Sequence, residues 1–176
     1  MFKKIVLISL ISICFTGCIK LNDDVVVLVD ETDNSETVEN DLQRPLFETG
    51  VIRIETLRGE YFDINVEIAE TQQEQSYGLM YVDKLEENEG MWFPYNQERA
   101  LSFWMKNTLV PLDILFVNKD FEIVDIKENF LPCKAEDCES YTALAKAQYV
   151  LEVIGEYSEI NDINIGDKIY PILMDE

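Results

Sequence analysis

The chain has 176 residues, with 35 acidic and 14 basic side chains, no histidine and a formal net charge of −21. Proteins that bind nucleic acid place Lys and Arg on the phosphates, so this balance argues against such a partner and against adhesion to an anionic membrane surface. Without histidine, Ser-His-Asp and Cys-His catalysis in their usual forms and the commonest transition-metal ligand are excluded. We therefore predict no cofactor and no metal site.

A signal peptide is predicted over residues 1–17. A basic start and an apolar run precede Thr16-Gly17-Cys18, and this run is shorter than the roughly 20 residues of a membrane-spanning helix. Small residues before a cysteine are typical of bacterial lipoproteins. We therefore expect Cys18 to be lipidated and to anchor the exported protein in the cell envelope, on the periplasmic or the surface side. Phe15 departs from the usual aliphatic residue, and an ordinary secretory signal with an incidental Cys18 is the alternative.

Residues 18–48 are predicted to form an acidic tether. This segment is rich in carboxylates and poor in aromatic side chains, so it cannot bury enough apolar area to offset the entropy of ordering. Residues 25–29 are an apolar exception that could add an edge strand. The folded domain is expected over residues 49–176.

The first half of that domain is predicted to be a hairpin followed by a short helix. Residues 51–57 and 61–68 alternate apolar and polar side chains around a turn at Gly59. Thr71 and Glu74 have the spacing of a capping box and start a helix that ends at Gly78. A short strand rich in aromatic residues follows at residues 90–95.

The second half is predicted to consist mainly of antiparallel strands. Residues 101–105 and 112–117 are two strands joined by a polar corner, and Asp113 is a carboxylate inside an apolar run. Further strands are expected at residues 121–127, 149–154 and 168–173, with one helical turn at 157–162. The predicted fold class is α+β, mainly antiparallel β, as a small closed barrel or a sandwich with one or two short helices.

Cys133 and Cys138 are the cysteines that remain after Cys14 in the signal peptide and Cys18. In an exported chain a disulfide is the expected state, and it would close the loop over residues 129–143. A redox-active pair is the alternative, although the spacing is not that of a Cys-x-x-Cys motif.

Several motifs together resemble the domain of unknown function 192, also called uncharacterised protein family 0127. They are GLMYVDKLEENEGMWF, LSFWMKNTLVPLDILFV, LPCKAEDCESY, AQYVLEV and IGDKI, in this order over residues 51–173. The resemblance implies a small, mainly β domain, often behind a signal sequence or lipid anchor. It supplies no reaction, because no activity is established for the family. Residues 155–160 are less regular here than the helix common in the family.

Convergent polar chemistry is concentrated at the polar corner between the two central strands. A shallow pocket for a sugar or another polyhydroxylated ligand is one interpretation, with an aromatic platform and hydrogen-bonding groups around it. The alternative is structural: Lys106 and Asp113 pair to fix the corner, and Asn107 and Thr108 satisfy the loop backbone. The candidate ligand-binding residues are Trp92, Trp104, Lys106, Asn107, Thr108 and Asp113.

Two classes of function remain open. The first is a binding or interaction module of the cell envelope, with a glycan or another envelope component as its ligand. The second is a small hydrolase that acts on an envelope polymer. Glu74, Glu89 and Asp113 are the carboxylates that a glycoside hydrolase could use, but nothing in the sequence brings them together. No residue is assigned a catalytic role, and whether the protein is an enzyme is left open.

Overall fold

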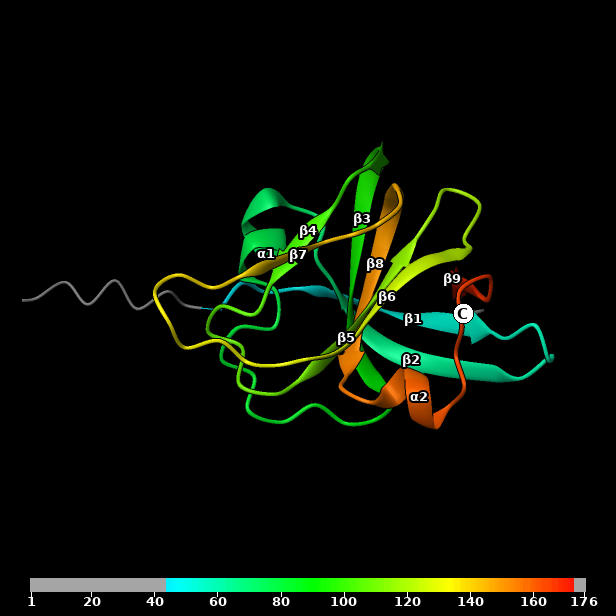
Figure 1. The fold of residues 1–176 in the computed structure, drawn as a ribbon, viewed down its shortest axis with the longest axis horizontal. Helices are drawn as coiled ribbons and strands as arrows, with labels where there is room; N and C mark the ends of the chain where they lie inside the picture. Colours follow the sequence, from blue (N-terminus) through cyan, green and yellow to red (C-terminus); the bar gives the residue numbers. More distant parts are fainter. Residues whose placement is uncertain (1–43, 173–176) are drawn as a thin grey trace, which may run out of the picture. The chain divides into compact units, whose positions relative to one another are not determined.

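Nine strands and two short helices form over residues 44–172, the part of the chain that the computed structural model describes (Figure 1). The predicted signal peptide, the lipidation site at Cys18 and the apolar run at residues 25–29 lie outside the described residues. The elements are β1 (Glu48–Glu55), β2 (Tyr61–Ile68), α1 (Gln72–Tyr77), β3 (Glu89–Arg99), β4 (Ser102–Trp104), β5 (Leu112–Val117), β6 (Ile123–Phe130), β7 (Ser140–Thr142), β8 (Ala147–Ile154), α2 (Tyr157–Ile160) and β9 (Lys168–Ile172).

The local predictions for the first half are confirmed. β1 and β2 pair as an antiparallel hairpin, and Gly59 takes a φ of 82° in the turn between them. The α1 capping box is complete: Thr71 Oγ1 accepts from the Glu74 amide at 3.2 Å, and Glu74 Oε2 accepts from the Thr71 amide at 2.8 Å. Gly78 ends the helix with a positive φ of 52°.

Seven strands form one sheet in the order β6-β5-β8-β3-β2-β1-β9, and β4 pairs separately with β7. Every pair is antiparallel except β2 with β3, which run parallel. The predicted strand at residues 90–95 is longer than expected, because β3 extends over 11 residues between β2 and β8. The two central predicted strands belong to different sheets, since β4 pairs with β7 and β5 lies between β6 and β8.

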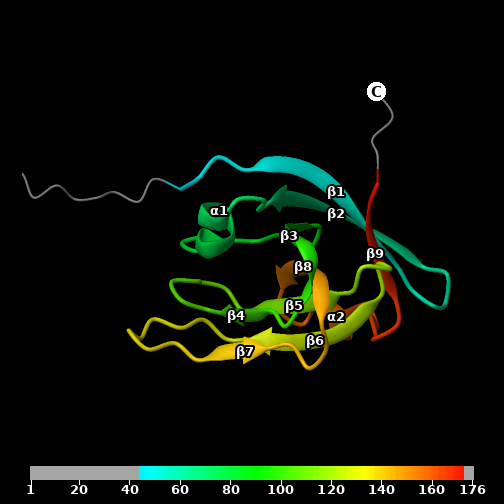
Figure 2. The same ribbon diagram turned by 90° about the horizontal axis from the view of Figure 1, so that it is seen from above.

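The sheet curls without closing, so the closed-barrel alternative is wrong and the arrangement is sandwich-like. Figure 2 shows β1 and β2 on one side and β6 on the other, with β3, β8 and β5 between them. A barrel needs a continuous hydrogen-bonded ladder between its edge strands. Here the edges β6 and β9 are joined at one end by an isolated bridge between Glu122 and Lys168 and by three neighbouring backbone hydrogen bonds, and no ladder continues along them. β9 is five residues long and pairs along β1, and its contact with β6 is confined to the first residues of both strands.

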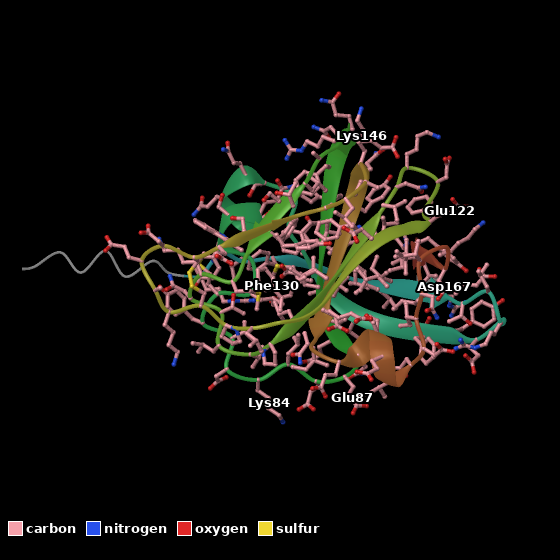
Figure 3. The ribbon with its side chains drawn as sticks, in the orientation of Figure 1. Lys84, Glu87, Glu122, Phe130, Lys146 and Asp167 are labelled. Atoms are coloured by element: carbon pink, nitrogen blue, oxygen red, sulfur yellow. A yellow bond between two sulfur atoms is a disulfide. The ribbon has the colours of Figure 1, made fainter. Side chains whose placement is uncertain are left out.

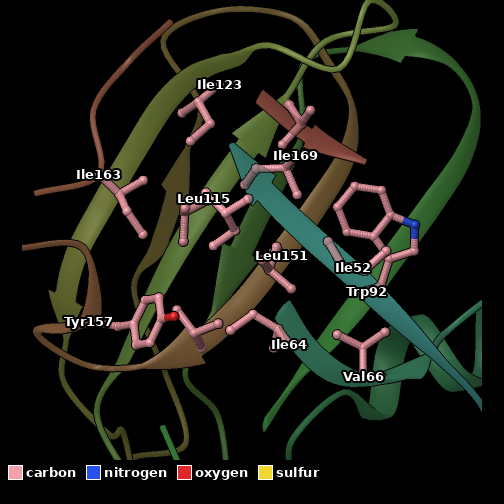
Figure 4. Close-up of a cluster of buried hydrophobic side chains, with 13 residues drawn as sticks. Ile52, Ile64, Val66, Trp92, Leu115, Ile123, Leu151, Tyr157, Ile163 and Ile169 are labelled. Carbon is pink, nitrogen blue, oxygen red and sulfur yellow. The ribbon is translucent and has the colours of Figure 1, made fainter. Parts of the chain in front are cut away.

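Each face of the sheet carries its own apolar core. The first core lies inside the curl, where side chains of β1, β2, β5 and β8 meet those of β9 and α2 (Figure 4). The second lies on the other face, beneath residues 101–105 of the β4 segment, and α1 and the β4–β7 pair lie toward the same end of the sheet in Figures 1 and 2. Successive strand residues point to opposite faces, so Leu151 and Val153 enter the first core and Val150 enters the second.

Asp113 joins the end of β6 and the start of α2 to β5, and it does not pair with Lys106. It is fully buried on β5, where its carboxylate accepts hydrogen bonds from the amides of Asn129 at 2.8 Å, Glu156 at 3.0 Å and Ser158 at 2.7 Å. The predicted ion pair is wrong, because Asp113 shares its face of β5 with Leu115 of the first core. Lys106 follows Met105, which belongs to the second core on the opposite face.

Two other buried aspartates act in the same way. Asp125 on β6 accepts from the Tyr141 hydroxyl at 2.9 Å and from the Leu144 amide at 2.8 Å. Asp167, labelled in Figure 3, accepts from the amides of Leu57 at 2.8 Å and Asn164 at 2.7 Å. A carboxylate that accepts two or more such bonds offsets its own desolvation and satisfies donors that would otherwise be unpaired.

We expect Asp113→Asn to lower the free energy of unfolding by about 2–4 kcal/mol, because an amide directs its NH₂ group at backbone donors that now bond to a carboxylate. Lys106→Met should change this free energy by less than about 0.5 kcal/mol, as for other surface side chains. Urea unfolding followed by circular dichroism measures both. Equal losses in the two variants would contradict the structural role of Asp113 and restore the ion pair.

Candidate functional site

Glu152 is the fourth buried carboxyl group of the described chain, and it differs from the other three. It lies on β8 opposite Met91 of β3 and Ile114 of β5, with only 4% of its surface exposed. Alternation along β8 directs its side chain into the second core, beside Val150. No hydrogen bond within residues 44–172 reaches its carboxyl oxygens, and desolvation alone shifts its pKa. These oxygens are not fully enclosed, since the enclosed side-chain atoms without a partner in this part of the chain are Arg44 Nε and Ser158 Oγ.

This burial changes the protonation state of the group. Desolvation disfavours the carboxylate and raises the pKa of Glu152 to about 8. At neutral pH the side chain is therefore mostly a neutral carboxylic acid with one O–H donor. A protonated carboxyl group without a partner is able to bind an acceptor or to release a proton to one.

A small pocket of about 20 Å³ opens above Glu152. Residues 75–80, at the end of α1 and just after it, form one wall, and the rings of Phe93 and Phe103 contribute apolar surface. Trp104, Lys106 and Thr108 also line it. A cavity of this size has room for about one water-sized group. Only a single functional group of a ligand can therefore enter, and the rest of the ligand has to lie outside, beside the exposed residues of the rim.

Three of the six predicted ligand-binding residues thus come together at one pocket. Trp104 is 45% exposed, and Lys106 Nζ lies 5.4 Å from the centre of its ring, a cation–π contact. Thr108 is buried. Of the residues that line the pocket, Lys106 is the only one with a permanent positive charge.

The other three predicted residues do not line this pocket. Asn107 forms the corner itself: its φ is 57°, its amide donates to the Cys133 carbonyl at 3.1 Å, and its carbonyl accepts from the Tyr81 amide at 2.9 Å. Asp113 and Trp92 face the first core on the opposite side of the sheet. Trp92 is buried and stacks on Tyr149 with ring centres 5.2 Å apart, so it is not a ligand-binding residue of this pocket.

The predicted disulfide between Cys133 and Cys138 is present, with Cα atoms 5.9 Å apart. Its loop also supports the pocket. The Cys133 amide donates to the Met105 carbonyl at 3.0 Å, and Cys133 forms an isolated parallel bridge with Lys106. The covalently closed loop is therefore bonded to the backbone that carries Lys106, which gives the disulfide a positioning role next to the site.

Sequence reasoning missed Glu152, although a signal for it was present. The run Val150-Leu151-Glu152-Val153 contains a carboxylate among apolar residues, as does the run around Asp113. The same cost of burying a carboxylate that drew attention to Asp113 applies to Glu152. The sequence pattern does not show whether a buried carboxyl group finds hydrogen-bond donors. Asp113 accepts from three backbone amides, whereas no donor in the described residues reaches Glu152.

The carboxylates considered for glycoside hydrolysis do not converge. Glu74 bonds to the α1 N-terminus, and Asp113 is occupied by backbone amides. Glu89 lines a separate groove of about 600 Å³ at the start of β3, where Arg44 pairs with Glu67. Across residues 44–172, no group of three or more acidic or cysteine side chains has the geometry to hold a metal ion. None of the described helices is long and apolar enough to cross a bilayer.

The fold and the pocket define a small, mainly β domain with a buried acidic group beneath a short loop. The model of DUF192, a family described as an uncharacterised ACR, matches residues 53–170, and the chain belongs to this family. No curated protein shows significant similarity to it.

Solved structures that are similar to this chain include two crystal structures. One is of a candidate transcription regulator from Sinorhizobium meliloti 1021, with 30% identity, a TM-score of 0.67, and coverage of 71% of this chain and 95% of that one. The other is of a protein of unknown function from Novosphingobium aromaticivorans DSM 12444, with 32% identity and a TM-score of 0.66. That match covers 70% of this chain and 86% of the other.

The raised pKa of Glu152 predicts a specific dependence of stability on pH. The unfolded chain releases this proton near the ordinary pKa of 4.5 and the folded chain near 8. Glu152 therefore lowers stability progressively as pH rises through this window, by a few kcal/mol at most. Glu152→Gln should match the parent at pH 5 and be more stable than it at pH 9, as measured by urea unfolding.

Glu128 is an exposed glutamate on β6 and provides the control. Glu128→Gln should leave the pH dependence of unfolding as it is in the parent. An unchanged pH profile in Glu152→Gln would show that the buried carboxyl group does not titrate with a raised pKa.

Proposed function

We propose that this protein is a cell-envelope binding module, and that its site is the pocket above Glu152. The proposed ligand is a glycan or another polyhydroxylated envelope component. The observation that carries the proposal is the convergence of Trp104, Lys106 and Thr108 on a pocket whose buried carboxyl group has no partner in the described chain. Buried polar groups in proteins are normally hydrogen-bonded, so an unpaired group that lines a pocket is a candidate ligand contact.

The residues around the pocket suit a sugar. The half-exposed face of Trp104 offers an apolar platform on which a sugar ring can lie. Lys106 and Thr108 supply donors at its edge, and the small volume admits one substituent of the ring. We do not extend to this chain the description of its Sinorhizobium relative, because a net charge of −21 disfavours contact with nucleic acid.

Hydrolysis of an envelope polymer is the second candidate, and one observation favours it. A glutamic acid that stays protonated at neutral pH is suited to donate a proton to a leaving group. Glycoside hydrolysis by the usual mechanisms also needs a second carboxylate, at roughly 5–9.5 Å from the first. The pocket lining contains no acidic side chain besides Glu152, so binding is the better supported function.

Lipidation is the basis for placing this module in the envelope, and intact-mass measurement tests it. We expect protein extracted from membranes to begin at Cys18 and to carry a diacylglyceryl adduct, because residues 1–18 have the order of a lipoprotein signal. Cys18→Ser should release the protein from the membrane fraction. A soluble mature chain without the adduct would contradict the anchor.

Binding to immobilised polysaccharides and to isolated cell-wall fragments tests the site. Trp104→Ala and Lys106→Met should each weaken binding at least about tenfold, because the first removes the platform and the second the charged donor. Lys127→Met is the matched control: its ammonium also lies over aromatic rings, 5.3 Å from the centre of the Phe130 ring, but Lys127 does not line the pocket. Equal binding by all three variants would refute this site, and release of new reducing ends would favour hydrolysis.

A further inference from the structure

We infer that the ligand carries an oxyanion, a carboxylate or phosphate, and that one oxygen of this group enters the pocket between Lys106, Thr108 and Glu152. The inference rests on the proposed function and names its ligand class: an acidic saccharide. Lys106 and Thr108, from residues 104–108, and Glu152 of β8 all line this pocket. Their chemistry is complementary to a group that accepts hydrogen bonds.

The first argument is the kind of groups that line the pocket. An ammonium has three donors and no acceptor, a protonated carboxyl group has one donor, and a hydroxyl group can donate as well. An oxygen of a carboxylate or phosphate can accept from all of them at once, and its charge strengthens each bond. A ligand ammonium would instead face Lys106, the only cation that lines the pocket.

The second argument is the difference between Glu152 and the three buried aspartates. Asp113, Asp125 and Asp167 each accept at least two hydrogen bonds from donors in their surroundings. Glu152 is as deeply buried, and none of the described residues bonds to its carboxyl group. A ligand acceptor would satisfy the O–H of Glu152 and remove the cost of leaving it unpaired.

The third argument is size. About 20 Å³ is enough for one oxygen, but a whole phosphate or a sugar ring does not fit. The acidic group therefore binds by one corner, and the rest of the ligand remains at the rim, where Trp104 is exposed. This arrangement couples the acidic group and the ring in a single ligand.

The charged and titratable groups around Glu152 set the expected pH dependence. Burial raises the pKa of Tyr95 on β3 to about 12, with Glu152 contributing to the rise, and the Arg99 guanidinium lies 4.7 Å from the Tyr95 ring centre. Tyr77 and Lys106 also line the pocket, whereas β5 presents the uncharged Ile114. With its pKa raised to about 12, Tyr95 stays neutral at both pH 6.5 and pH 9. Ionisation of Glu152 near pH 8 is then the change that repels an anion.

Isothermal titration of the purified full chain, in detergent, with four glucose derivatives tests the inference. The probes are methyl glucoside, methyl glucuronide, glucose 6-phosphate and glucosamine, at pH 6.5 and pH 9. At pH 6.5 we expect the two acidic sugars to bind at least about tenfold more tightly than the other two. Between pH 6.5 and pH 9 the affinity for the acidic sugars should fall at least about tenfold. Acetate and inorganic phosphate are titrated alone as the ring-free counterparts.

Glu152→Gln tests whether ionisation of the carboxyl group causes the pH dependence of binding. The amide keeps an N–H donor but cannot ionise, so this variant should bind acidic sugars at both pH values with less than about a threefold change between them. Lys106→Met should lose the preference for acidic over neutral sugars. Glu128→Gln should behave as the parent does.

The outcomes separate this inference from the proposed function. If the neutral sugar or the amino sugar binds as tightly as the acidic sugars or more tightly, the inferred preference for an oxyanion is wrong. The proposal of a glycan-binding module would still hold. If acetate or phosphate binds and none of the sugars does, the oxyanion site is supported and the proposal that the ligand is a glycan is wrong. A Glu152→Gln variant with the parent's pH profile would overturn the role of Glu152, and the absence of binding by every probe would overturn both proposals.

Discussion

The cost of burying a carboxyl group organises this domain. Both faces of the central sheet are covered, so an acidic side chain on β5 or β8 has to enter an apolar layer. At Asp113 the cost is offset by three backbone amides, one at the end of β6 and two in the segment that follows β8. These bonds fix where the two segments leave the sheet, and α2 begins directly at one of them. Asp125 and Asp167 hold their own neighbouring loops by the same chemistry.

Glu152 is the place where this compensation is absent from the described residues, and it is also the place where a pocket opens. Protein interiors tolerate an unpaired polar group poorly, and such groups concentrate at functional sites. The cation, the hydroxyl group and the exposed tryptophan around it come from one short segment. That segment is held from one side by its continuity with the second core and from the other by the disulfide loop.

Membership of the DUF192 family and the two similar crystal structures agree on the fold, and none of them assigns an activity to this chain. The function proposed above therefore depends on the site. The proposed function has two parts, a ligand-binding site and a membrane anchor. The site is a pocket of the described domain, whereas the anchor rests on the sequence of residues 1–18. Each part can fail without the other.

Local chemistry in the sequence determined the hairpin around Gly59, the capping box of α1, the disulfide and the antiparallel character of the sheet, because each depends on residues that are close along the chain or on strand periodicity. It also selected Trp104, Lys106 and Thr108. Only the tertiary structure decided that the sheet stays open, that Asp113 and Lys106 lie on opposite faces, and that Glu152 lines the pocket. The physical reason is that hydrogen-bond donors decide whether a buried carboxyl group is a compensated carboxylate or an unpaired acid. Those donors come from segments far away in the sequence.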